Sequence, residues 1–313
     1  IVFGDWSSDV CSSDLLPGKG TYNEDGTMII ALREMFVDVY NAETYQLIKS
    51  IPLAISGVYT VLLSPDGNLL IASGLKFVQF IDFHTGNIIH SMNKFGDEKR
   101  DVEITADLIT KDSKYYIIAL WDPVKGSYGS MMFINTSTYQ MDYKYNKRVG
   151  SGLTISNDGQ FVAFNSIDEP NIAVTIMNTQ TKEIVGHIPG NATNVCGLSF
   201  SPNGEYIAIS WLDKLNIEIF DVNTFKLLKS LKLILNENSC CFPAMAIDKK
   251  GLYLTGGGGP GLVLFNFSPL NIPIEEEIIQ TLYPNPTNNS VNLSFELTIP
   301  ANLEFNLYDL SGA

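Results

Sequence analysis

Histidine and cysteine are scarce in this chain, which holds three histidines and four cysteines among its 313 residues. No two cysteines have the C-x-x-C spacing of a zinc site, and no histidine stands in a recognisable motif with a serine or cysteine nucleophile. We therefore predict no metal, no cofactor and no catalytic residue. Cys240 and Cys241 are expected to alternate in and out of a strand, with a strained vicinal disulfide as the alternative in an oxidising compartment.

Basic residues are also few, since 20 lysines and arginines stand against 34 aspartates and glutamates and give a net charge of −14. Such an acidic chain repels phosphate backbones, so we expect no nucleic-acid partner. No apolar run reaches the roughly 18 residues of a transmembrane helix, and no transmembrane segment is predicted. The chain starts at Ile1 without a signal peptide, and we expect that the natural start of the protein is missing.

Hydrophobic residues make up 45% of the chain, enough for one large domain with a sizeable core and a small second domain. A turn of the Ser-x-Asp-Gly type recurs in the middle of the chain. Its last residue stands at positions 26, 67, 113, 159, 204 and 251, a repeat of about 45 residues. Asp-Gly and Asn-Gly supply the positive φ angles of a tight hairpin, and short runs rich in β-branched and aromatic residues predict strands between the turns.

A second marker keeps the same spacing and reads Asn or Asp, two further residues, then Thr. It begins at Asn41, Asp82, Asn135, Asn178 and Asp221. A side chain of this type can cap its own turn by a hydrogen bond to the backbone. A period near 45 residues with four short strands per unit is typical of β-propeller blades. We therefore predict an all-β chain: a β-propeller over residues 16–268 with six visible four-stranded blades, or seven in the intact protein, followed by the first strands of a small β-sandwich.

Two segments of this region resemble WD-repeat and YVTN-type propellers. They are Gly-Leu-Ser-Phe-Ser-Pro-Asn-Gly at residues 197–204 and Ile-Glu-Ile-Phe-Asp at residues 217–221. The Trp-Asp pair that ends the third strand of a WD repeat is replaced here by Phe220 and Asp221 or their equivalents. The resemblance implies a WD-like or YVTN-like propeller over about residues 18–268.

The first 15 residues stand apart from the repeats. Ser-Ser-Asp occurs twice, at residues 7–9 and 12–14, with neither a helical nor a strand period. This segment resembles translated sequencing-adapter sequence. We predict that residues 1–15 are a non-native tail without contacts to the core.

The composition shifts again after the repeats, and residues 269–281 are predicted to be a linker. Residues 282–313 open with Tyr283, Pro284, Asn285 and Pro286 and end in a run from Asp309 to Gly312. They resemble the start of the type A sorting domain of type IX secretion, with its Tyr-Pro-Asn-Pro opening and Asp-x-x-Gly strand end. The resemblance implies the type IX secretion machinery as a partner and a place at the bacterial outer membrane, at the cell surface or in the medium. The alternative is an ordinary Pro-Asn-Pro turn before a hairpin.

Aromatic and acidic residues follow the second strand of three repeats, where that strand should end near one face of the ring. They are Trp121, Asp122, Asp168, Trp211 and Asp213. Such residues on one rim can form a patch for a protein or glycan ligand, and the alternative is that the tryptophans pack between blades. The glycine-rich residues 256–261 lack the lysine and helix of a phosphate loop and predict a hairpin loop.

Two functions from different classes fit this sequence. The first is a non-catalytic binding or scaffold module that is displayed on the cell or released from it. The alternative is a secreted propeller enzyme, lactonase-like or glycan-active, which would need several carboxylates or a metal site converging on the central channel. A propeller fold by itself does not decide between them.

Overall fold

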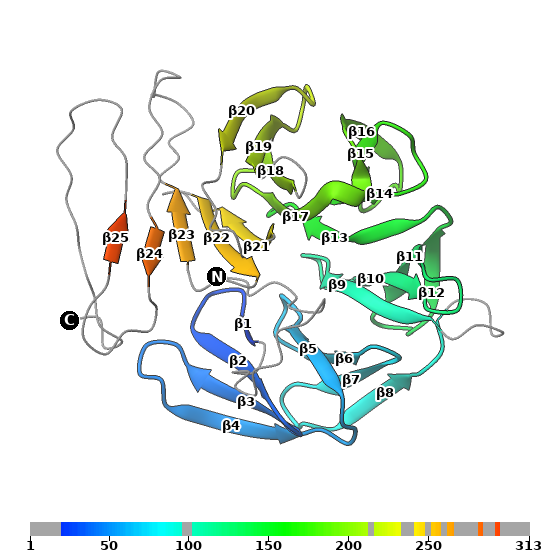
Figure 1. Ribbon diagram of the computed structural model, residues 1–313. Coiled ribbons are helices and arrows are strands. Elements are labelled where there is room, and N and C mark those ends of the chain that lie inside the picture. Colours follow the sequence, from blue (N-terminus) through cyan, green and yellow to red (C-terminus); the bar gives the residue numbers. More distant parts are fainter. Residues whose placement is uncertain are drawn as a thin grey trace.

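The chain folds into a succession of small antiparallel sheets. The computed structural model describes residues 20–95, 102–211, 216–232, 241–247, 252–257, 262–265, 281–283 and 292–294. Five four-stranded sheets follow one another along the chain, and we call them blades 1 to 5, each with strands A to D in chain order. Figure 1 shows the blades arranged around a ring, with strand A of each nearest the centre.

The strands of blades 1 to 5 pair with their neighbours in sequence, so every blade is a simple meander. Blade 1 holds β1 (Gly20–Tyr22), β2 (Met28–Arg33), β3 (Phe36–Asn41) and β4 (Leu47–Pro52). Blade 2 holds β5 (Val58–Leu63), β6 (Leu69–Gly74), β7 (Phe77–Asp82) and β8 (Ile88–Met92). Blade 3 holds β9 (Glu103–Ile109), β10 (Tyr115–Asp122), β11 (Ser127–Asn135) and β12 (Met141–Tyr145). Blade 4 holds β13 (Val149–Ile155), β14 (Phe161–Ser166), β15 (Ile172–Asn178) and β16 (Ile184–Pro189). Blade 5 holds β17 (Val195–Phe200), β18 (Tyr206–Trp211), β19 (Asn216–Asp221) and β20 (Leu227–Lys232).

A sixth sheet has three strands among the described residues, β21 (Cys241–Ile247), β22 (Leu252–Gly257) and β23 (Leu262–Phe265). A separate pair, β24 (Thr281–Tyr283) with β25 (Asn292–Ser294), follows it. The helical structure in the described part is one short 3₁₀ turn, η1 (Ala192–Asn194). No described helix is long and apolar enough to cross a membrane. The predicted all-β class and the propeller-like succession of blades are confirmed. The predicted tail at residues 1–15 lies outside the described residues.

The hydrophobic core lies between blades. Four buried clusters are present, and each joins side chains of two consecutive blades: 1 with 2, 2 with 3, 3 with 4, and 4 with 5. The inner strands of neighbouring blades also lie against each other, as β1 does with β5 and β13 with β17. A single four-stranded sheet cannot cover both of its faces, so each blade depends on its neighbours for burial.

The turn between strands A and B has the chemistry that the sequence predicts. In blade 2, the Gly67 amide donates to the Ser64 carbonyl at 2.8 Å, and Gly67 has a φ of 74°. The Ser64 hydroxyl donates to the Asp66 carboxylate at 2.5 Å and accepts from the Leu69 amide at 2.8 Å. The equivalent serine or threonine makes the same two contacts in blades 3, 4 and 5. One set of hydrogen bonds thus closes the turn between strands A and B and fixes the first residue of strand B.

The second marker caps the turn between strands C and D, also as predicted. The Asp82 carboxylate accepts from the Thr85 amide at 2.7 Å, and the Asp221 carboxylate accepts from the Thr224 amide at 2.7 Å. Asn41, Asn135 and Asn178 accept from the two corresponding amides with their side-chain oxygen. Asparagine and aspartate therefore cap the turn with the same hydrogen bonds at this position.

The residue that directly follows the marker has a left-handed backbone in each of blades 1 to 5. We call these plug residues: Tyr45, Gly86, Tyr139, Lys182 and Phe225, with φ between 56° and 74°. A bulky residue rarely adopts this conformation, and a favourable contact of its side chain can offset the backbone strain. The side chains of Tyr139, Lys182 and Phe225 contact the preceding blade.

Tyr139 of blade 3 packs on Phe80 and His90 of blade 2, with ring centroids 4.9 and 4.6 Å away. The Phe225 ring of blade 5 occupies the space beside Gly186 of blade 4, where an added Cβ would stand 2.1 Å from it. The Lys182 ammonium of blade 4 lies 3.9 Å from the ring centroids of Tyr115 and Phe133 in blade 3. Tyr139, Lys182 and Phe225 therefore each pack against the blade that precedes their own.

Candidate functional site

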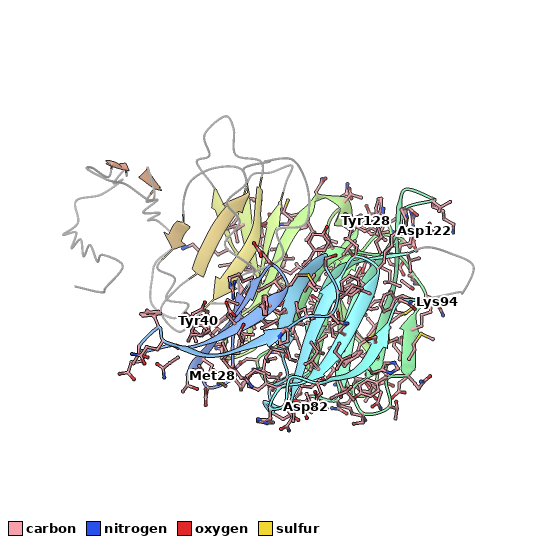
Figure 2. All side chains as sticks on the ribbon, turned by 90° about the horizontal axis from the view of Figure 1, so that it is seen from below. Met28, Tyr40, Asp82, Lys94, Asp122 and Tyr128 are labelled. Atoms are coloured by element: carbon pink, nitrogen blue, oxygen red, sulfur yellow. The ribbon has the colours of Figure 1, made fainter. Side chains whose placement is uncertain are left out.

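The turns between strands B and C lie at one end of the ring, which we call the BC face. Figure 2 views the ring from the side and shows Asp122 and Tyr128 at this end, opposite Met28 and Asp82. Trp121 and Asp122 end β10, Asp168 follows the end of β14, and Trp211 ends β18, so these four rim residues belong to this face. The loops at one end of a propeller are a common place for ligands, since they vary without disturbing the blades.

Trp121 and Asp122 have local partners in blade 3. The Trp121 ring meets Tyr128 of β11 edge to face, with centroids 5.1 Å apart. The Asp122 carboxylate is buried, accepts from the amides of Val124 and Lys125 at 3.1 Å each, and lies 3.9 Å from the Lys125 ammonium. Both side chains therefore shape the turn that joins β10 to β11.

Asp168 lies in the corresponding turn of blade 4 and binds Arg148. Its carboxylate accepts from the Arg148 amide at 2.7 Å and from the guanidinium Nε at 2.6 Å. The hydrogen bond from that amide and those from the guanidinium lower the pKa of Asp168. The contact ties the turn to the start of β13.

Trp211 is buried to 2% exposure and belongs to the core cluster between blades 4 and 5. Its ring fills the space beside Gly190, where a Cβ would come within 2.5 Å of the indole, and Gly190 has a φ of 144°. The tryptophan therefore packs between blades, as in the alternative interpretation of the rim. Asp213 lies outside the described residues. The structure gives the rim residues separate local partners, and their role in ligand binding stays a prediction.

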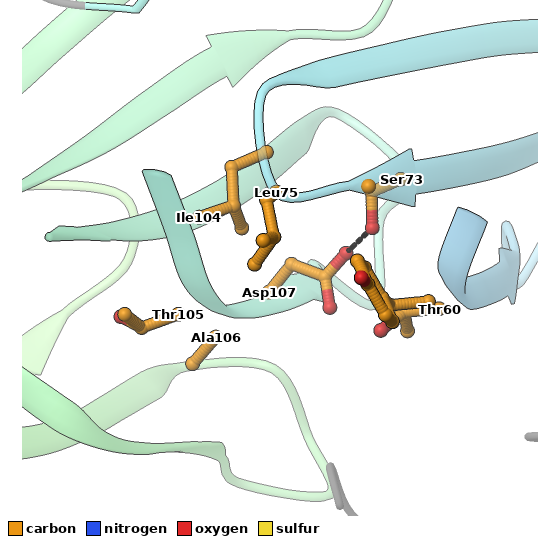
Figure 3. Close-up of a pocket in the computed structure, with 9 residues that line it drawn as sticks. Thr60, Ser73, Leu75, Ile104, Thr105, Ala106 and Asp107 are labelled. Atoms are coloured by element: carbon orange, nitrogen blue, oxygen red, sulfur yellow. Dashed lines mark hydrogen bonds between the residues drawn. The ribbon is translucent and has the colours of Figure 1, made fainter. Parts of the chain in front are cut away.

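A pocket that the repeat pattern does not predict opens between blades 2 and 3. It is a shallow hollow of about 10 Å³, roughly the space of one water molecule, lined from blade 2 by β5, the end of β6 and the turn at Leu75, and from blade 3 by the first part of β9. Among the described residues that line it, Asp107 is the charged one, and Tyr59, Thr60 and Thr105 are neutral polar neighbours. Figure 3 shows the Asp107 carboxylate reaching from β9 toward Ser73 of β6.

Two buried hydroxyls hold the Asp107 carboxylate. Ser73 Oγ donates to its Oδ2 at 2.6 Å, and Tyr116 Oη donates to the same oxygen at 2.7 Å. Ser73 is 3% exposed and Tyr116 is fully buried. Burial, and next the charge of Asp107, raise the pKa of Tyr116 well above its usual value, so this hydroxyl keeps its proton and remains a donor.

A second polar chain crosses blade 4. The hydroxyls of Ser166 and Thr175 are hydrogen-bonded to each other, and Thr175 Oγ1 lies 3.0 Å from His187 Nδ1. These residues come from β14, β15 and β16, so the chain runs from the middle of the blade to its outer strand. Among the described residues, no group of three or more histidine, cysteine, aspartate or glutamate side chains could hold a metal ion.

The sorting motif is described in part. Tyr283 ends β24 and pairs with Asn292 of β25. Pro284, Asn285, Pro286, Asp309 and Gly312 lie outside the described residues. Neither a comparison with protein-family models nor a search of curated proteins finds a match to this chain.

Proposed function

We propose that this protein is a binding or scaffold module of the WD-like or YVTN-like propeller type, exported by type IX secretion and displayed on the bacterial cell or released from it. The observation that carries the export proposal is the motif Tyr283, Pro284, Asn285 and Pro286 at the start of a unit separate from the blades. Tyr283 is the last residue of β24, and β24 pairs only with β25 among the described strands. Tyr283, the first residue of the motif, thus ends a strand whose described pairing is with β25.

The binding proposal rests on the blades. Their repeated turns and markers close hairpins within each blade, whereas the turns at the BC face differ in length and sequence from blade to blade. A rigid scaffold with variable loops at one end is suited to recognising a protein or glycan.

The export proposal is tested with the complete gene in a type IX-competent host and in the same host with the system inactivated. We expect the propeller at the cell surface or in the medium only in the competent host. A matched variant lacks residues 282–313 and should stay in the periplasm of the competent host. Equal export in both hosts, or retention in the cytoplasm in both, would contradict the proposal.

A further inference from the structure

We infer that Asn203 is a modification site, at which solvent water converts the side-chain amide to a carboxylate with loss of ammonia when the turn between strands A and B of blade 5 opens. Asn203 and Gly204 form the one Asn-Gly pair among the 313 residues. A glycine favours this reaction because it has no side chain to shield its backbone nitrogen. The inference goes beyond the proposed function and does not depend on it.

The reaction is a ring closure followed by a hydrolysis. The backbone nitrogen of Gly204 gives up its proton to solvent and forms a bond to Cγ of Asn203, and the side-chain nitrogen leaves as ammonia. Water then opens the succinimide ring. Cleavage of the bond to Cγ gives aspartate, whereas cleavage of the bond to the main-chain carbonyl carbon gives isoaspartate. Ring closure requires that the backbone nitrogen and the side chain are both free to move.

The folded turn holds both reacting groups. The Gly204 amide donates to the Ser201 carbonyl at 2.9 Å. The Asn203 side-chain oxygen accepts from the Ser201 hydroxyl at 2.7 Å and from the Glu205 amide at 3.2 Å. Asn203 is exposed, so water reaches the turn, and the hydrogen bonds rather than burial protect the amide. Conversion therefore follows local opening of the turn, which costs less than unfolding the whole ring.

The product meets a glutamate that the turns of blades 1 to 4 lack. Nδ2 of Asn203 donates to the Glu205 carboxylate at 2.6 Å. In blade 2 the two roles are exchanged, since Nδ2 of Asn68 donates to the Asp66 carboxylate at 3.1 Å. Conversion of Asn203 thus replaces a hydrogen-bond donor by a second carboxylate next to Glu205, and the repulsion between them loosens the turn.

The test follows Asn203 in the purified full chain by peptide mass spectrometry during incubation at neutral pH, in buffer and in guanidinium chloride. In the denaturant we expect Asn203 to convert faster than every other asparagine. In buffer its conversion should be at least about tenfold slower, because the opened turn is a minor population. Equal rates in the two media would overturn the inference, as would faster conversion of another asparagine in the denaturant. This comparison uses the unchanged chain and stays decisive if a variant fails to fold.

Two serine variants separate opening of this turn from global unfolding. Ser201→Ala removes the hydroxyl that holds Asn203, so conversion in buffer should accelerate about three- to tenfold and stay unchanged in guanidinium chloride. Ser156→Ala is the matched control, because Ser156 makes the same two contacts around Asp158 in blade 4. It should change the rate at Asn203 less than about twofold. Equal acceleration by both variants would show that global unfolding sets the rate and would overturn the inference.

A final measurement addresses Glu205. Asn203→Asp, which reproduces the aspartate product, should raise the equilibrium constant of unfolding about two- to fivefold, the size expected of an exposed charge pair. In a Glu205→Gln background the same replacement should change this constant less than about twofold, because the glutamine amide can donate to the new carboxylate. Equal losses in the two backgrounds would overturn the role assigned to Glu205.

Discussion

The imidazole of His90 stacks on the ring of Tyr139, with centroids 4.6 Å apart and planes 12° from parallel. His90 lies on the outer strand of blade 2, and Tyr139 is the plug residue of blade 3. The contact joins blades 2 and 3 near their outer strands. Its residues are distant in sequence from the inner strands, which also join the two blades. The outer contact gives a direct way to measure how strongly one blade holds the next.

Tyr139→Ala should lower the free energy of unfolding by about 1–3 kcal/mol, because it removes a half-buried ring from Phe80 and His90. The matched control is Tyr45→Ala. Tyr45 has the same backbone conformation, with a φ of 56°, but is 67% exposed, so its replacement should cost no more than about 0.5 kcal/mol. Urea unfolding of both variants measures the difference. Equal losses would show that the backbone conformation, and not the contact between blades, sets the cost.

The lowered pKa of Lys182 predicts that the free energy of unfolding depends on pH in the alkaline range. Its ammonium lies 3.9 Å from the ring centroids of Tyr115 and Phe133, and burial lowers its pKa to about 8. The unfolded chain keeps that proton up to about pH 10.4, so between pH 8 and 10.4 unfolding takes up a proton and stability rises with pH.

Lys182→Met should remove this rise. The stability of the wild type relative to the variant should therefore increase from about pH 8 to about pH 10 and stay constant below pH 7. Comparing the two proteins cancels the titration of tyrosines and other lysines. Parallel curves over the whole range would show that Lys182 keeps an ordinary pKa.

The marker aspartates predict acid sensitivity. Hydrogen bonds from the Thr85 amide and hydroxyl lower the pKa of Asp82, and those from Thr224 lower the pKa of Asp221. A carboxyl with a lowered folded pKa stabilises the protein above its unfolded value near 3.9, and this contribution is lost as the pH falls through the folded pKa.

The double variant Asp82→Asn, Asp221→Asn should therefore fold normally at pH 7 and lose less stability than the wild type below about pH 4. Asparagine already makes these hydrogen bonds at Asn41, Asn135 and Asn178, which makes the replacement conservative. Thermal unfolding at pH 7, 4 and 3 measures the effect. A variant that is as acid-sensitive as the wild type would assign the sensitivity to other carboxylates.

Gly190 tests the packing of Trp211. Gly190→Ala places a Cβ 2.5 Å from the indole and forces a side chain onto a φ of 144°, so we expect a loss of about 1–3 kcal/mol or more. Gly67→Ala is the control, since its φ is also positive but nothing lies within 4 Å of the added atom. It should cost only the backbone strain, about 1 kcal/mol. Equal costs would show that the indole moves aside without loss.

The repeats were predictable because turn chemistry and spacing are local properties of the sequence. The Ser64 network and the capping by Asp82 follow from residue types within a few positions of each other. The plug position was not predictable, since its occupants differ between blades and share only a backbone conformation. The pocket was not predictable for a related reason: Asp107 stands at a polar position of an alternating strand, where a solvent-exposed aspartate would have the same sequence pattern. Its significance depends on Ser73, which comes from another blade.

The direction of the plug contacts has a consequence for synthesis on the ribosome. Gly86 lies near Ile51, Tyr139 near Phe80, and Phe225 near Gly186, so in each case a later blade holds an earlier one. A nascent chain therefore secures each blade only when the next has emerged, and assembly proceeds from the N-terminus toward the C-terminus, one unit behind elongation.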